Sequence, residues 1–176
     1  EAGIMDVPPR SRKESLLNGP LIVRAFFWYG LLESIFSTAA YFFLNWLHGW
    51  PGVPLASSGT VYLMATAMTF AATVFSQIGM VFNCRTQQLS VFKKRLFSNR
   101  LILFGVAVEV AIVALWVYLP VPGMHALFNT APLGWREWLF LIAIPPVMLF
   151  ADELRKAFLR RRDRRKMHGN KIQGDV

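Results

Sequence analysis

The sequence predicts an all-α membrane protein with four transmembrane helices and both termini in the cytoplasm. Three observations support this fold class. The 176 residues are 55% hydrophobic and 14% aromatic, against about 45–50% apolar residues in soluble domains. Four apolar stretches each approach or exceed the roughly 20 residues that cross a bilayer as a helix. The basic residues lie almost entirely in the segments on one side of these stretches.

The four spans are predicted over about 21–47, 60–84, 101–119 and 135–156. They divide the chain into a cytoplasmic link over 1–20, a transmembrane region over 21–158 and a basic cytoplasmic tail over 159–176. The link has no apolar core, so it is no signal peptide, and we expect it to continue from an upstream segment. Pro145 and Pro146 should kink the fourth span, because proline removes an amide donor from a helix.

The distribution of basic residues gives the orientation. Four lie at or before Arg24, five lie over 85–100 and nine follow from Arg155 onward, which leaves only Arg136 on the opposite side. Lysine and arginine favour the cytoplasmic face. The chain is therefore predicted to be a multi-pass protein of the cell membrane.

The tail "RKAFLRRRDRRK" is basic enough to suggest nucleic acid. It follows a span directly, however, where basic runs orient a helix and contact anionic lipid. We therefore expect the lipid bilayer as its partner and no nucleic acid.

Polar residues recur along one side of the second span at spacings of three and four, which places them on one helical stripe. They are Thr66, Thr69, Thr73, Ser76, Gln77 and Asn83. Serine and threonine commonly join helices in membranes, and this explains Thr66 and Thr69. Gln77 is larger and carries a strong carbonyl acceptor, so both helix packing and a ligand role remain open for it.

Within or beside the spans lie Glu33, Glu109, Asp152 and Glu153. Glu109 lies about eight residues into the third span, roughly 12 Å from its inner end, at a depth similar to that of Gln77. A carboxylate there is costly and usually faces a pathway or a partner. Glu33 is near the middle of the first span and either pairs with a helix outside this chain or is protonated. Asp152 and Glu153 are expected to form ion pairs with the adjacent Arg155 and Lys156.

No catalytic site is predicted in this segment, and no cofactor site. Cys84 is the single cysteine, the three histidines are scattered, and there is no glycine-rich phosphate loop. The segment alone should not hydrolyse ATP.

Several motifs resemble P-type cation-transporting ATPases. "GIMDVPPRSRKESLLNG" is similar to the cytoplasmic link after their sixth transmembrane helix, with Val7 in place of an arginine and Ser15 in place of a proline. The resemblance continues through "VFNCRTQQLSVF", "LFSNRLILFG", "FNTAPLGWREW" and "DELRKAFLRRR". It implies a calcium-pump-like C-terminal region, helices seven to ten, whose parent chain uses ATP and magnesium in upstream domains. The upstream transmembrane helices would then be its partners.

The resemblance also implies cation-path residues. Gln77 falls where calcium pumps of the sarcoplasmic-reticulum type place a cation-binding Glu, and where plasma-membrane calcium pumps and sodium pumps have Gln. Glu109 matches a Glu of sodium pumps that is associated with an additional ion site. Met80 stands where sodium pumps have Asp, and a neutral Gln77 departs from the two-calcium arrangement. Gln77 and Glu109 are thus the principal metal candidates, with Ser76 and Asn83 as further ones.

The leading hypothesis is therefore the C-terminal membrane domain of an ATP-driven cation pump. We expect calcium as the transported cation, with sodium or another monovalent ion as the second choice. The alternatives are a stand-alone four-helix scaffold and a small proton-coupled exporter that uses Glu33 or Glu109.

Overall fold

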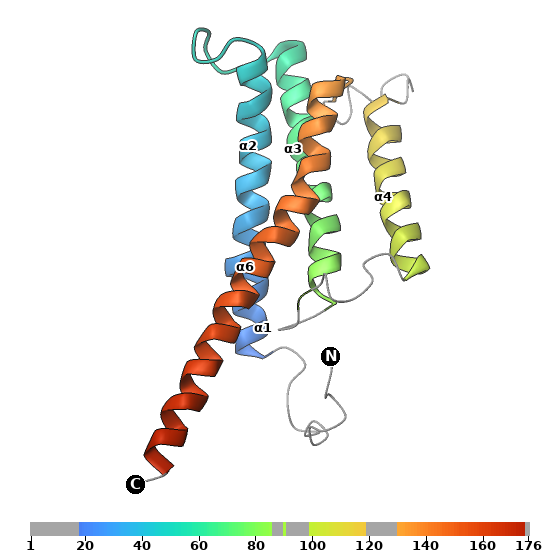
Figure 1. Cartoon of the computed structure of the whole chain (residues 1–176). Helices are drawn as coiled ribbons and strands as arrows, with labels where there is room; N and C mark the ends of the chain where they lie inside the picture. Colours follow the sequence, from blue (N-terminus) through green and yellow to red (C-terminus); the bar gives the residue numbers. More distant parts are fainter. Residues whose placement is uncertain (1–17, 86–89, 91–98, 119–129, 175–176) are drawn as a thin grey trace.

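The computed structural model of the chain describes residues 18–85, 90, 99–118 and 130–174, and side chains as far as Arg162. Most of the link predicted over 1–20 lies outside these residues, as do most of the 85–100 loop and the side chains at the end of the tail. Figure 1 shows long helices running side by side, with the last one extending beyond the others.

The described residues are helical and contain no strand, which confirms the all-α fold class. The first span is one continuous rod made of α1 (Gly19–Val23), the π-helical η2 (Arg24–Gly30) and α2 (Leu31–Leu47). It is followed by α3 (Gly59–Asn83), α4 (Arg100–Tyr118) and α6 (Trp135–Gly174). In the described part, three helices are long and apolar enough to cross a membrane: Gly19–Leu47, α3 and α4.

The start of the first span follows from its local sequence. The side chain of Asn18 accepts a hydrogen bond from the backbone N–H of Leu21 at 3.0 Å, and Pro20 occupies the first turn. An Asn cap followed by an early proline is a common beginning of a helix. The π-helix that follows was not predicted from the sequence.

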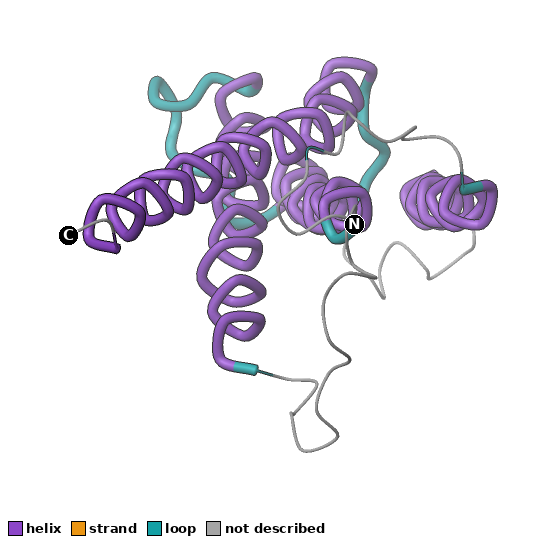
Figure 2. Tube along the Cα trace, turned by 60° about the horizontal axis from the view of Figure 1, so that its bottom comes forward, coloured by secondary structure: helices purple, strands orange, loops and turns teal. Residues whose placement is uncertain are grey.

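Helix α3 is the centre of the bundle and packs mainly against α2 and α6. Its buried face is built of small residues, including Ala65, Ala71 and Ala72, which allow the neighbouring backbones to approach closely. Helix α4 makes fewer contacts and stands at the edge, as Figures 1 and 2 show from two directions.

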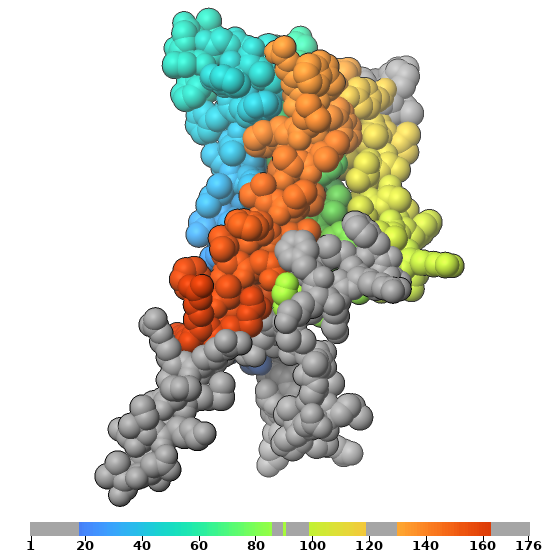
Figure 3. All heavy atoms as spheres, in the orientation of Figure 1, coloured from blue at the N-terminus to red at the C-terminus, as the bar shows by residue number. Residues whose placement is uncertain are grey.

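Helix α6 crosses the front of the bundle in Figure 3 and continues past the predicted end of its span. It also runs through Pro145 and Pro146 without ending. At this crossing it lies very close to α3, because a Cβ placed on Gly79 would be 2.8 Å from the Cβ of Met148. Glycine is therefore required at position 79 for this contact.

Large apolar side chains cover much of the outside. Phe26, Phe27, Leu101 and Phe104 are each more than two-thirds exposed. Such a surface is unsuited to water and fits lipid or further helices. The chain is a multi-pass membrane protein.

Candidate functional site

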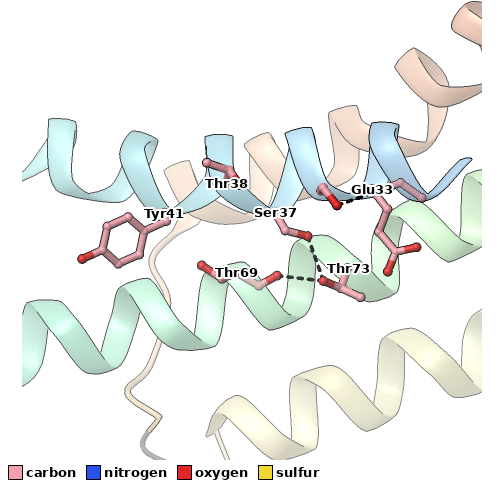
Figure 4. Close-up of a pocket in the computed structure, with 8 residues that line it drawn as sticks. Glu33, Ser37, Thr38, Tyr41, Thr69 and Thr73 are labelled. Atoms are coloured by element: carbon pink, nitrogen blue, oxygen red, sulfur yellow. Dashed lines mark hydrogen bonds between the residues drawn. The ribbon is translucent and has the colours of Figure 1, made fainter. Parts of the chain in front are cut away.

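A polar groove of about 670 Å³ lies between α2 and α3. Its lining residues carry mostly oxygen-bearing side chains: Glu33, Ser34, Ser37, Thr38, Tyr41, Thr69 and Thr73, together with Gly30. In Figure 4 the side chain of Glu33 extends from α2 toward α3, and the hydroxyls of Ser37 and Thr73 meet between the two helices. The groove thus contains a carboxylate and several hydroxyl groups between two membrane-spanning helices.

One hydrogen bond sets the register of α2 on α3. The Oγ of Ser37 lies 2.8 Å from the Oγ1 of Thr73. The two helices are antiparallel, so residues one turn inward from this pair are Glu33 on α2 and Gln77 on α3. Each is four residues, or about 6 Å, from the hydroxyl pair, and the two are therefore at the same depth.

The polar stripe of α3 divides between two interfaces. Thr73 faces α2 through Ser37, whereas Ser76 and Asn83 are fully buried on the side of α6. Gln77 is exposed on the surface of the described chain. It is therefore available to helices that this chain does not contain.

Ser76 and Asn83 both form buried hydrogen bonds. The Oγ of Ser76 donates to the carbonyl of Ala72 at 2.8 Å, within the same helix. The Nδ2 of Asn83 donates to the carbonyl of Met148 on α6 at 3.1 Å. These hydrogen bonds account for the packing of both residues, whereas the Oδ1 of Asn83 is buried without a hydrogen-bond partner among the described residues.

Glu109 lies on α4, away from the groove. Its side chain is half-buried, and its Oε2 is buried without a hydrogen-bond partner among the described residues. An unsatisfied acceptor at this depth is costly unless it meets a partner from another helix. The structure therefore leaves Glu109 as a candidate that is separate from the Glu33 and Gln77 pair.

A buried ion cluster joins η2 of the first span to the middle of α6. Asp152 is fully buried and accepts from the hydroxyl of Tyr29 at 3.2 Å and from the Nε of Arg155 at 2.7 Å. The Nζ of Lys156, also fully buried, lies 3.0 Å from the other carboxylate oxygen. Glu153 lies 3.8 Å from the same ammonium group. The predicted pairing of Asp152 and Glu153 with neighbouring cations is confirmed.

Glu33 is the site residue whose role the sequence left open. The signal was present, because Glu33, Ser37 and Tyr41 recur at a spacing of four and so share one face of a helix. Apolar residues such as Phe36 stand between them in the sequence and make this stripe hard to recognise. Only the packing of α2 on α3 shows that the two polar stripes form one groove.

The groove can supply oxygen ligands but not a complete cation site. Hard cations bind through oxygen ligands, and calcium takes about six to eight of them. No group of three or more His, Cys, Asp or Glu residues that could hold a metal occurs among the described residues. The remaining ligands would have to come from other helices.

Comparison with known proteins relates the chain to cation-transporting ATPases. The family model described as "Cation transporting ATPase, C-terminus" matches residues 1–158. The calcium-transporting ATPase 1 of Schizosaccharomyces pombe is 27% identical over 90% of this chain, which corresponds to 16% of that protein. The calcium-transporting ATPase 1 of Bacillus cereus is 29% identical over 87% of the chain and 17% of that protein. The potassium-transporting ATPase alpha chain 1 of Xenopus laevis is 26% identical over 92% of the chain and 18% of that protein. The chain spans less than a fifth of the length of these relatives.

Proposed function

Because the chain belongs to the family of cation transporting ATPase C-termini, we propose that it supplies helices seven to ten of an ATP-driven cation pump. In this proposal both termini are cytoplasmic. ATP and magnesium are used by upstream domains, and the upstream helices of the same pump cover the open side of the bundle. This segment supports transport but does not hydrolyse ATP.

The observation that carries the proposal is the polar groove between α2 and α3 with the exposed Gln77 beside it. A stand-alone helical bundle would turn such groups inward, because lipid offers them no hydrogen bonds. Here Glu33 is half-buried in the groove, and Gln77 is exposed at the same depth. An open polar side is what a partial bundle requires when it completes an ion path with further helices.

Calcium is the cation that we propose first. Two of the relatives named above are calcium-transporting ATPases, and Glu33 and Gln77 together offer one charged and one neutral oxygen ligand. A monovalent cation is the second candidate, because the relative from Xenopus laevis is a potassium-transporting ATPase. Monovalent ions need fewer charged ligands than calcium does, and a neutral Gln77 is compatible with either.

The experiment that tests this proposal is ATP-driven uptake by the full-length protein in sealed vesicles. Uptake of calcium that requires both ATP and magnesium, and that stops in the presence of a calcium ionophore, supports the calcium assignment. Uptake of sodium or potassium alone would replace calcium by a monovalent ion. ATP-independent cation uptake coupled to a proton gradient would instead favour the exporter hypothesis.

A further inference from the structure

A second pocket, of about 970 Å³, lies between the π-helix η2 and the inner part of α6. Leu154 and Phe158 form apolar walls and are 49% and 69% exposed, and Trp28 faces them from η2. Arg155, Arg161 and Arg162 also line the pocket. It therefore combines an apolar cleft with a cluster of arginines.

The pocket lies at one edge of the membrane. Arg155 is 20 residues along α6 from Trp135, about 30 Å at 1.5 Å per residue. This length matches the hydrocarbon core of a bilayer, which is about 30 Å thick. The arginines thus lie at headgroup level while Leu154 lies at the start of the acyl region, on the side that the proposed orientation makes cytoplasmic.

Two donors in the pocket walls lack a hydrogen-bond partner. The Nε1 of Trp28 and the Nη2 of Arg155 are both buried without an acceptor among the described residues. The Nε of Arg155 is already held by Asp152 at 2.7 Å, so the guanidinium has a fixed orientation. Buried donors without acceptors are unfavourable, and a negatively charged oxygen at this wall would satisfy them.

We propose that this pocket is a binding site for one anionic phospholipid. The headgroup phosphate accepts from the Arg155 Nη2 and the Trp28 Nε1 and is attracted by Arg161 and Arg162, because guanidinium groups bind phosphate through directed, charge-assisted hydrogen bonds. One acyl chain lies along Leu154 and Phe158. The apolar wall distinguishes this site from one for free phosphate, and the anionic cytoplasmic leaflet supplies the ligand. The proposal does not depend on which cation is transported.

The test is native mass spectrometry of the full-length pump in detergent, titrated with phosphatidylglycerol or phosphatidylcholine. We expect one tightly retained phosphatidylglycerol per molecule and weaker retention of phosphatidylcholine. Arg162→Gln should weaken retention about fivefold, which corresponds to roughly 1 kcal/mol per basic residue. Phe158→Ser should also weaken it, because the acyl wall is lost.

Arg160→Gln is the matched control. It removes the same charge from the same helix, but Arg160 does not line the pocket and instead lies 4.0 Å from Glu153. Equal losses for Arg160→Gln and Arg162→Gln would overturn the proposal and indicate diffuse attraction to the basic tail. Displacement of the lipid by millimolar inorganic phosphate, with no effect of Phe158→Ser, would overturn the lipid assignment. Absence of retained phosphatidylglycerol on the unaltered pump would also overturn it.

Discussion

The Oγ of Ser37 and the Oγ1 of Thr73 lie 2.8 Å apart and align α2 with α3. This contact brings Glu33 and Gln77 to one depth and so connects packing with the proposed ion path. Hydrogen bonds between membrane helices contribute about 0.6 kcal/mol on average. We expect a double-mutant cycle of Ser37→Ala and Thr73→Val in the full-length pump to give a coupling energy of about that size. Additive effects of the two changes on thermal stability would show that the contact does not stabilise the bundle.

The close crossing of α3 and α6 should not tolerate a side chain at Gly79. A methyl group there would meet Met148 at 2.8 Å, and overpacking of this kind costs about 1–3 kcal/mol. Gly79→Ala should therefore lower the melting temperature of the purified pump. Gly105→Ala on α4 is the control, because nothing lies within 4 Å of its Cβ position. Equal melting temperatures for the two variants would contradict the close crossing.

Asp152 should be essential for the stability of the contact between η2 and α6. Its removal leaves Lys156 buried without its nearest counter-charge, and breaking a buried ion pair on one side costs about 3–5 kcal/mol. Asp152→Asn should therefore abolish or strongly reduce expression of folded pump, as measured by size-exclusion chromatography. Glu153→Gln should have a smaller effect, because Glu153 is 3.8 Å from the same lysine and more exposed. A reversed order of severity would contradict the arrangement of this cluster.

The proposed orientation predicts opposite accessibility for two positions. Ser57→Cys, between α2 and α3, should react from outside intact cells with a membrane-impermeant maleimide, whereas Cys84 should react only after permeabilisation. Cys84 is exposed, but burial of its surroundings raises the pKa of its thiol. The reactive thiolate is therefore scarcer near neutral pH, and labelling of Cys84 should accelerate as the pH rises beyond the ordinary thiol range. Labelling of the Ser57→Cys variant only from inside would reverse the orientation.

The sequence predicted the helical structure of the described spans because long apolar runs bounded by charges and turn residues are sufficient for that purpose. The helix found over Gly59–Asn83, for example, closely coincides with the apolar run 60–84. The π-helix at Arg24–Gly30 escaped prediction, since one extra residue per turn changes hydrogen bonding without a clear mark in composition.

The site was only partly predictable, for a related reason. Periodicity places residues on one face of a helix, but it does not say which neighbour covers that face. The stripe of α3 is wide enough to serve two interfaces, so Ser76 and Asn83 turn toward α6 while Gln77 stays exposed. Glu33 lies near the polar stripe of α3 because of the register between α2 and α3. The sequence of one helix alone does not determine this register.

If Glu109 has a role separate from that of Gln77, substituting it should have a different effect on the pump. Its buried Oε2 lacks a partner among the described residues, and we propose that a group from a helix outside this chain meets it in the complete pump. Glu109→Gln should then lower the melting temperature of the full-length pump more than it changes the apparent cation affinity. An unchanged melting temperature would show that Glu109 has no such partner.

We propose that the exposed Gln77 and the groove beside it face the ion path of the complete pump. The most direct test measures ATPase activity against cation concentration in the reconstituted full-length enzyme. Gln77→Ala should weaken apparent cation affinity by about tenfold, equivalent to 1.4 kcal/mol, at nearly normal expression, and Gln77→Glu should shift affinity or coupling because it adds a charge. Thr66→Val is the control, because Thr66 bonds only within its own helix, to the carbonyl of Tyr62. Wild-type cation curves for both Gln77 variants would contradict the account.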